Sequence, residues 1–241
     1  IGNGFRVVQS LNEGSLDTLD NFIINYAERD ILEEKDVSDD VFNIYKKQFH
    51  YDQYEMDLKV DSILDVENYI TYRFETSPPY DSDEPLHGYV LYLNKYKNNL
   101  KPIIHFPNAW AIFSDSDDWI ISEAIKEYNY LLMEGYAIIC PVYYSTCNRK
   151  KILKTWWANE SDEYRDTMIK IGKDFKRSID FIESRNEFDI NYLSYVGYSW
   201  GSVMSNILLA IDDRVKSAFI CVGGLQVQKS KPEVDPAFYT R

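Results

Sequence analysis

Short apolar runs alternate with amphipathic stretches in the second half of this chain. Four such runs read IIHF, YAIICPVYY, YLSYVG and KSAFICVGG, at residues 103–106, 136–144, 192–197 and 216–224. Between them lie helical patterns near 118–134 and 200–210, and a longer one with apolar residues three and four apart: Tyr164, Met168, Ile171, Phe175, Ile179 and Ile182. Strands that alternate with helices form a parallel sheet covered on both faces. The sequence therefore predicts a doubly wound α/β domain.

Residues ahead of Pro102 follow a different pattern, in which apolar and polar side chains alternate. The alternation appears in three groups: Met56, Leu58 and Val60; Ile70, Tyr72 and Phe74; and Tyr89, Leu91 and Leu93. It predicts antiparallel strands at one side of the sheet. Residues 11–50 are acidic and predict a helical lead-in, whose clearest helix opens at Ser38-Asp39-Asp40. The main domain is expected over 51–241.

Charge and composition exclude several classes of partner. The 241 residues carry a formal net charge of −13, which repels nucleic acid and anionic membrane surfaces. An apolar run of the roughly 20 residues needed to cross a bilayer is absent, and IGNGFRVVQS does not read as a signal peptide. Cys140, Cys147 and Cys221 form neither an even disulfide set nor a metal-binding pattern. A cytoplasmic protein without a metal or cofactor is expected.

One pentapeptide carries recognisable chemistry. Gly197-Tyr198-Ser199-Trp200-Gly201 lies between the strand at 192–197 and the helix at 200–210. A serine at a tight turn from strand to helix needs small residues two positions before and after it, because side chains there would meet the neighbouring strand and helix. This pattern indicates Ser199 as a nucleophile, with the Trp200 amide at the positive end of the helix as one oxyanion donor.

The second oxyanion donor is expected in the loop after the strand at 103–106. Its sequence is Pro107-Asn108-Ala109-Trp110. Proline has no amide hydrogen, so Asn108, Ala109 or Trp110 must donate, and we favour Ala109. An ordinary strand-to-helix connection remains the alternative for this loop.

A general base for Ser199 is not evident in the sequence. Of the three histidines, His50 and His87 precede the parallel part of the sheet, and His105 lies inside a strand. None follows Ser199, although the histidine is expected after the nucleophile when the serine stands at a strand-to-helix turn of this kind. The carboxylates that follow Ser199 are Asp212, Asp213, Glu233 and Asp235, of which the first two precede a strand and so lie at the wrong end of the sheet.

Aromatic residues in loops after the strands predict a substrate pocket. The candidates are Trp110, Tyr143, Tyr144, Trp156 and Trp157, which can accept a sugar ring or an apolar acyl group or can instead pack under a lid. Arg149 can hold an anionic group of the substrate or remain solvated. The cluster of Asp115, Asp117 and Asp118 is interpreted as the capped start of the next helix rather than a cation site.

With these motifs, the chain from about 38 to 241 resembles the α/β-hydrolase superfamily, in its acetyl xylan esterase, dienelactone hydrolase and prolyl oligopeptidase branch. The supporting segments are VSDDVFNIYKKQFHYD, IIHFPNAW, CPVYYSTCNRK, DFKRSIDFIESRNEFDINYLSYVGYSWGS and KSAFICVGG. More narrowly, it resembles the hydrolase module that follows protein kinase and formylglycine-generating-enzyme-like domains in bacterial multidomain proteins. GNGFRVV at residues 2–8 resembles the closing strand of such an upstream domain, whose tail is then expected at 1–10.

The resemblance implies hydrolysis of a carboxylic ester through an acyl-enzyme on Ser199. It also implies an acid and a histidine after the strand at 216–224, so that the C-terminal strands of the domain are expected to be missing here. The 241-residue chain should then turn over simple esters slowly or not at all. An open sheet edge would favour pairing with a second chain or copy. A serine peptidase of the prolyl oligopeptidase type and a noncatalytic binding module are the alternatives.

Overall fold

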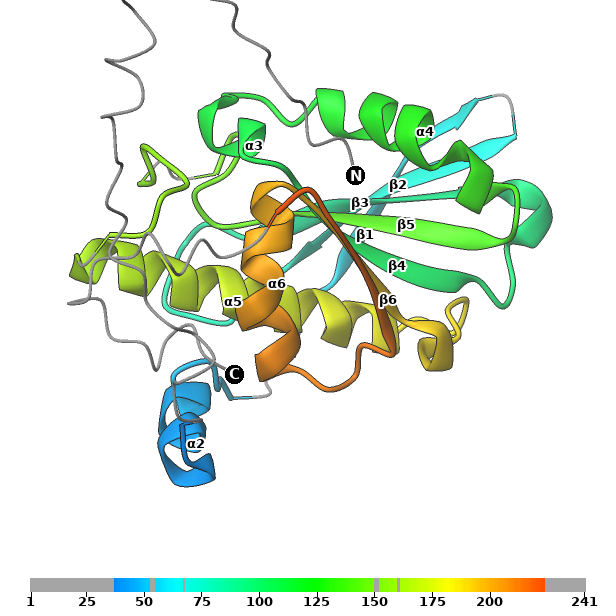
Figure 1. Cartoon of the computed structure of the whole chain (residues 1–241). Helices are drawn as coiled ribbons and strands as arrows, with labels where there is room; N and C mark the ends of the chain where they lie inside the picture. Colours follow the sequence, from blue (N-terminus) through cyan, green and yellow to red (C-terminus); the bar gives the residue numbers. More distant parts are fainter. Residues whose placement is uncertain (1–36, 53–54, 67, 150–151, 160, 224–241) are drawn as a thin grey trace, which may run out of the picture. The chain divides into compact units, whose positions relative to one another are not determined.

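The structure is a computed structural model that describes residues 37–52, 55–66, 68–149, 152–159 and 161–223. Its centre is a seven-stranded sheet with helices on both faces (Figure 1). The predicted tail at 1–10, most of the lead-in, and Glu233 and Asp235 lie outside the described residues. Within those residues, no helix is both long and apolar enough to span a membrane.

The sheet combines an antiparallel part and a parallel part, as predicted. Its order is β1-β2-β3-β5-β4-β6-β7, in which β1, β2, β3 and β5 pair antiparallel, and β5, β4, β6 and β7 pair parallel. The strands are β1 Lys59–Val66, β2 Tyr69–Thr76, β3 Leu86–Leu93, β4 Lys101–Phe106, β5 Tyr136–Val142, β6 Ser194–Tyr198 and β7 Ser217–Cys221. The first strand begins later than predicted, because Met56 and Leu58 precede β1 and only Val60 of the three alternating residues lies in it.

Helices cover both faces of the sheet. Helix α4 lies over one face, and α5 and α6 lie over the other (Figure 1). The helices are α2 Asp39–Lys47, α3 Trp110–Phe113, α4 Trp119–Leu132, α5 Asp162–Glu183 and α6 Trp200–Ile211, with short 3-10 turns at Asn94–Tyr96 and Ile190–Tyr192. The Ser38 side chain caps α2 by accepting from the Val41 amide, as its sequence predicts.

The core has two parts, one on each face of the sheet. On the α5 and α6 face, five of the six apolar residues that predicted the long helix are buried: Met168, Ile171, Phe175, Ile179 and Ile182. On the α4 face, Ile120, Ala124, Tyr128 and Leu132 pack against β3, β4 and β5. Because alternate residues of a strand point to opposite faces, each buried strand contributes to both parts of the core.

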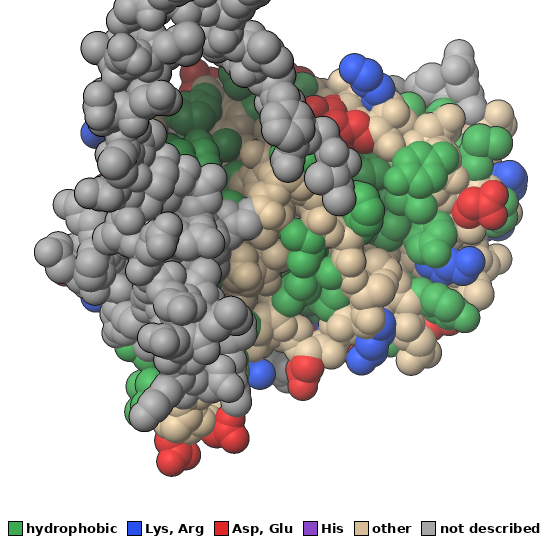
Figure 2. Space-filling model, in the orientation of Figure 1, with side chains coloured by type: hydrophobic (Ala, Val, Ile, Leu, Met, Phe, Trp, Pro, Cys, Tyr) green, Lys and Arg blue, Asp and Glu red, His purple; other side chains and the backbone are tan. Residues whose placement is uncertain are grey.

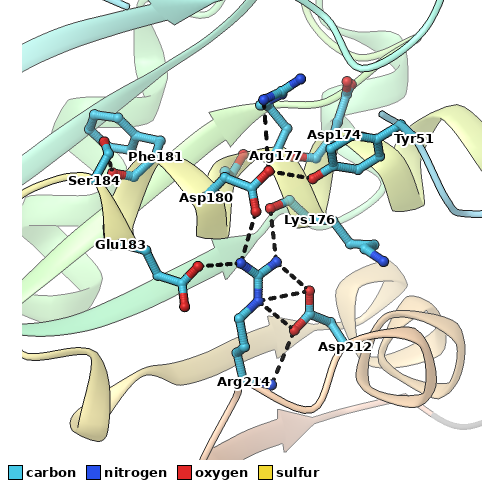
Figure 3. A network of polar contacts seen from close by, with 11 residues as sticks. Tyr51, Asp174, Lys176, Arg177, Asp180, Phe181, Glu183, Ser184, Asp212 and Arg214 are labelled. Carbon is cyan, nitrogen blue, oxygen red and sulfur yellow. Dashed lines mark hydrogen bonds and ion pairs between the residues drawn. The ribbon is translucent and has the colours of Figure 1, made fainter. Parts of the chain in front are cut away.

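A charged network joins α5 to the segment that leads into β7 (Figure 3). The Arg214 guanidinium donates to Asp212 at 2.6 Å and to Asp180 at 2.8 Å, and it also pairs with Glu183. Tyr51 donates to Asp180 at 2.6 Å. Asp212 precedes β7, so it lies at the amino end of the parallel strands, as predicted. This network therefore stabilises the amino ends of the parallel strands, opposite the end at which Ser199 lies.

Replacing Arg214 by Met should destabilise the fold, because buried Asp212 would lose its cation. We expect the free energy of unfolding to fall by about 2–4 kcal/mol, measured by urea denaturation. Arg165→Met is the matched control, since Arg165 pairs with Asp162 and Asp166 on the surface. Equal losses for the two variants would contradict the assigned role of Arg214.

Candidate active site

Ser199 lies in the turn that joins β6 directly to α6. Its backbone has φ 53° and ψ −108°, a conformation that residues with a Cβ rarely adopt. The turn is fixed on both sides: the Ser199 amide donates to the Cys221 carbonyl at 3.0 Å, and the Ser199 carbonyl accepts from the Val203 amide at 3.1 Å. Strain at Ser199 is thus maintained by β7 on one side and by the first turn of α6 on the other.

The two glycines that flank Ser199 allow backbone segments to touch. A Cβ on Gly197 would lie 2.6 Å from the Gly201 carbonyl carbon, and a Cβ on Gly201 would lie 2.5 Å from the Phe106 carbonyl oxygen. Such distances are too short for any side chain. The first turn of α6 therefore packs directly against the ends of β6 and β4, which agrees with the spacing argument made from the sequence.

Ser199→Gly should be more stable than Ser199→Ala, because only glycine adopts this backbone conformation without strain. We expect a difference of about 1 kcal/mol or more in the free energy of unfolding, measured by urea denaturation of both variants. If alanine were equally stable, the backbone strain at Ser199 would be refuted. Both variants lack the hydroxyl, so this comparison is independent of any activity.

Trp200 is the first residue of α6, and its side chain is buried against Phe106 with ring centroids 5.0 Å apart. Amides of the first helical turn have no acceptor within the helix. The Trp200 amide is therefore at a helix N-terminus next to Ser199, where a negative charge is favoured. Packing of the indole fixes the orientation of this amide relative to β4.

The loop predicted to hold the second donor begins beside the same helix. The Pro107 carbonyl oxygen lies 3.3 Å from the position of a Cβ on Gly201. The Asn108 side chain accepts from the Trp110 amide at 2.9 Å, so Trp110 is already engaged. Neither the Asn108 amide nor the Ala109 amide donates to another residue in the described part of the chain. Of the three predicted donors, Asn108 and Ala109 remain.

The aromatic residues predicted to line a substrate pocket differ widely in exposure. Trp110 is 62% exposed, whereas Tyr143 is 0% exposed and stacks on Phe106 in the core. Tyr144 is buried as well, so the expectation that these two tyrosines line the pocket is wrong. Both tyrosines follow β5, but their rings pack into the core instead of facing the solvent. Trp156 is half-buried and stacks on exposed Trp157, with centroids 3.9 Å apart.

Arg149 has neither of the roles that the sequence suggested. Its side chain is 1% exposed and donates to Asp174 at 2.6 Å, to the Val142 carbonyl at 2.8 Å and to Tyr80 at 2.8 Å. Burial lowers the pKa of Arg149, but the adjacent Asp174 outweighs this and raises it. Arg149 is thus a structural cation that fixes the loop after β5. Cys147 in the same loop is also buried.

Neither Asp117 nor Asp118 is seen to cap α4 with its side chain. Asp118 is the N-cap residue of α4, but its side chain accepts no hydrogen bond from the amides of the first turn. Asp117 is buried and accepts from His87 Nε2 at 2.9 Å and from the Tyr89 hydroxyl at 2.8 Å. Burial raises the pKa of Asp117, but these hydrogen bonds outweigh it and hold it at about 2. The interpretation as a helix cap is therefore corrected for Asp117.

His87 lies at the same end of the sheet as Ser199, the end at which the parallel strands have their carboxyl termini, although it precedes those strands in sequence. Because β3 runs antiparallel to β5, His87 near its start pairs with Val142 at the carboxyl end of β5. Three strand spacings separate β3 from β6. At roughly 4.8 Å each, they amount to about 14 Å, far beyond a hydrogen bond. His87 is thus excluded as the base by distance across the sheet.

His105 lies in β4 beside a hollow under α4. The hollow is small and partly open to solvent, and it is bounded by His105, Glu123 and Cys140 among others. The ring of Tyr128 lies edge-on to the imidazole, with centroids 5.6 Å apart. Burial lowers the pKa of His105 to about 4, so the imidazole is neutral near neutral pH.

Acidification should weaken the fold through His105. Between pH 6.5 and about 4 the unfolded chain binds a proton at this residue and the folded chain does not, so stability falls as the pH falls through this window. The His105→Leu variant should lose less stability than the wild type over the same window, by on the order of 1–3 kcal/mol, in urea denaturation at a series of pH values. His50→Gln, at an exposed histidine, should keep the wild-type dependence.

Comparison with known proteins identifies the fold. The sequence matches no model of a known protein family and no curated protein. Among solved structures, an acetyl xylan esterase from a Paenibacillus species has a TM-score of 0.54 at 15% identity, covering 83% of this chain and 65% of that one. A Thermoanaerobacterium acetyl xylan esterase has a TM-score of 0.52 at 14% identity, covering 75% and 56%. A glucuronoyl esterase from Solibacter usitatus has a TM-score of 0.52 at 11% identity, covering 75% and 56%.

These similarities define the class of fold: the chain has an α/β-hydrolase fold with a mostly parallel sheet, as the sequence predicted. The chain spans less than two thirds of the length of each of these three proteins.

Proposed function

We propose that this chain carries the nucleophile of a serine hydrolase that acts on carboxylic esters. The observation that carries the proposal is the strained turn at Ser199, which the close packing around Gly197 and Gly201 maintains. A conformation that costs free energy persists where the surrounding structure imposes it, and such positions cluster at functional sites. The turn leaves Ser199 partly exposed at the carboxyl edge of the sheet.

In the proposed reaction, Ser199 Oγ attacks the ester carbonyl, the alcohol leaves, and water then releases the acid from the acyl-enzyme. The Trp200 amide and the amide of Ala109 or Asn108 stabilise the oxyanion. Ser199 also needs a general base to accept its proton. His87 is too distant, and half-buried His105 has its pKa lowered to about 4 by desolvation. We therefore assign the base to a group outside the described residues.

Exposed aromatic rings near the loops of this edge support an ester of a sugar as the substrate class. Trp110 and Trp157 offer flat apolar surfaces of the kind on which sugar rings stack. The structurally similar proteins include acetyl xylan and glucuronoyl esterases. A peptide substrate, as in prolyl oligopeptidases, remains the alternative within the same mechanism.

A fluorophosphonate probe tests the nucleophile directly, because it phosphonylates activated serines. We expect slow labelling of the 241-residue chain that Ser199→Ala abolishes, measured by mass spectrometry of the labelled peptide. Ser202→Ala is the matched control, since Ser202 is a buried serine one turn further along α6. Labelling that persists in Ser199→Ala would exclude Ser199. If the wild type is not labelled and also does not hydrolyse simple esters, the noncatalytic alternative is favoured.

The noncatalytic alternative is supported by strand β7. It lies at the edge of the sheet, and its apolar residues are exposed: Phe219 at 64%, Ile220 at 49%, and Val222 just beyond it at 70%. An edge strand with exposed apolar side chains can pair with another chain. Pairing with a second copy, and fusion to kinase and formylglycine-generating-enzyme-like domains, stay predictions.

A further inference from the structure

We infer that His87 and Tyr89 act as positioning residues for the proposed oxyanion donor, because together they hold Asp117 and thereby fix residues 107–118. We name these three side chains the Asp117 clamp. The inference rests on the proposed function, since residues 107–118 include the donor loop and α3. It assigns a role to a buried polar cluster that takes no part in nucleophilic attack.

The course of residues 107–118 explains why an anchor is needed. The segment leaves β4 at Pro107 and reaches β3 at Asp117, and β5 lies between these two strands. It therefore crosses the carboxyl end of β5. Apart from the four-residue α3, no regular element supports it over this distance. Without fixed points, the Asn108 and Ala109 amides would not keep a constant position relative to Ser199.

Three contacts fix the segment along its length. At its start, the Phe106 and Pro107 carbonyls pack on Gly201. In its middle, the Ala111 carbonyl accepts from the Cys147 amide at 2.6 Å. Near its end, Asp117 Oδ2 accepts from both His87 and Tyr89, at 2.9 Å and 2.8 Å. The buried side chains of Ala111 and Ile112 add apolar packing in the middle of the segment. Of the three contacts, the Asp117 clamp is the one made by side-chain hydrogen bonds.

The clamp is built as a strong anchor. All three side chains are buried, and both donors come from one strand of the sheet, whose position is fixed by pairing on both sides. Hydrogen bonds to a buried carboxylate are stronger than those between neutral groups. A second set of bonds stiffens the turn beside it: Trp119 Nε1 donates to Ser114 Oγ at 3.0 Å and to the Ser116 carbonyl at 2.8 Å. Motion at Asp117 would thus be transmitted to α3 and the donor loop.

The test combines hydrogen exchange with the labelling of Ser199 in the 241-residue chain, for Asp117→Asn and the milder Tyr89→Phe. We expect amide exchange over 107–113 to become about tenfold faster while exchange over 199–205 stays unchanged. We also expect the maximal rate of fluorophosphonate labelling to fall by about threefold to tenfold with an unchanged half-saturating probe concentration, since a misplaced donor weakens the transition state rather than probe binding.

Tyr72→Phe is the matched control. Tyr72 is also a buried tyrosine that donates to a carboxylate, that of Glu187 at 3.0 Å, but this pair lies near the amino end of β4. It should leave both the exchange over 107–113 and the labelling rate as in the wild type. The exposed neighbour Asp118→Asn should do the same.

The outcomes separate the clamp from the proposed function. Unchanged exchange over 107–113 in both clamp variants would overturn the inference, as would the same increase in Tyr72→Phe. Faster exchange with an unaltered labelling rate would overturn the positioning of the donor. Faster exchange in a protein whose wild type is never labelled would support the clamp as the anchor of the segment and refute the proposed function.

Discussion

Direct contact between backbone segments around Ser199 is the constraint on which the candidate site depends. Helix α6 starts at the residue after Ser199 and touches β6 and the end of β4 through Gly197 and Gly201. A helix that starts so close to the sheet leaves no residue for a relaxed turn, so Ser199 takes a positive φ. The same contact brings the loop after β4 beside the first amides of α6. Strain, a partly exposed serine and two neighbouring sets of backbone amides thus follow from one packing arrangement.

Buried charges at the two edges of the sheet have different consequences. At the amino edge, Arg214 joins α5 to the start of β7, which concerns stability alone. At the carboxyl edge, Asp174 holds Arg149, and Asp117 holds His87 and Tyr89. Asp174 fixes the loop that follows β5, and Asp117 fixes the segment that follows β4, the neighbour of β6. A buried ion pair adds little net stability compared with apolar packing, but its geometry is specific. These pairs are therefore best understood as determinants of loop position.

Much of the fold could be predicted because it follows from local periodicity. The stripe from Met168 to Ile182 and the apolar runs of β4, β5 and β6 identify themselves within a few residues, and the glycine spacing around Ser199 is equally local. The side chains that were misjudged have distant partners. Arg149 pairs with a residue 25 positions away, and Asp117 with one 30 positions away. A charged residue in a loop appears solvated in the sequence unless its partner is known.

The histidines show why order in the sequence and order across the sheet must be treated separately. His87 precedes the parallel strands in sequence, yet the antiparallel direction of β3 places it at the carboxyl edge. His105 is on β4, the neighbour of β6, but its imidazole lies against Tyr128 beside the hollow under α4. A base must reach Ser199 Oγ within hydrogen-bond distance, roughly 3 Å. A base must lie at the carboxyl end of the strands, it must be close to β6, and it must have an open path to the Ser199 hydroxyl. Neither His87 nor His105 meets all three requirements.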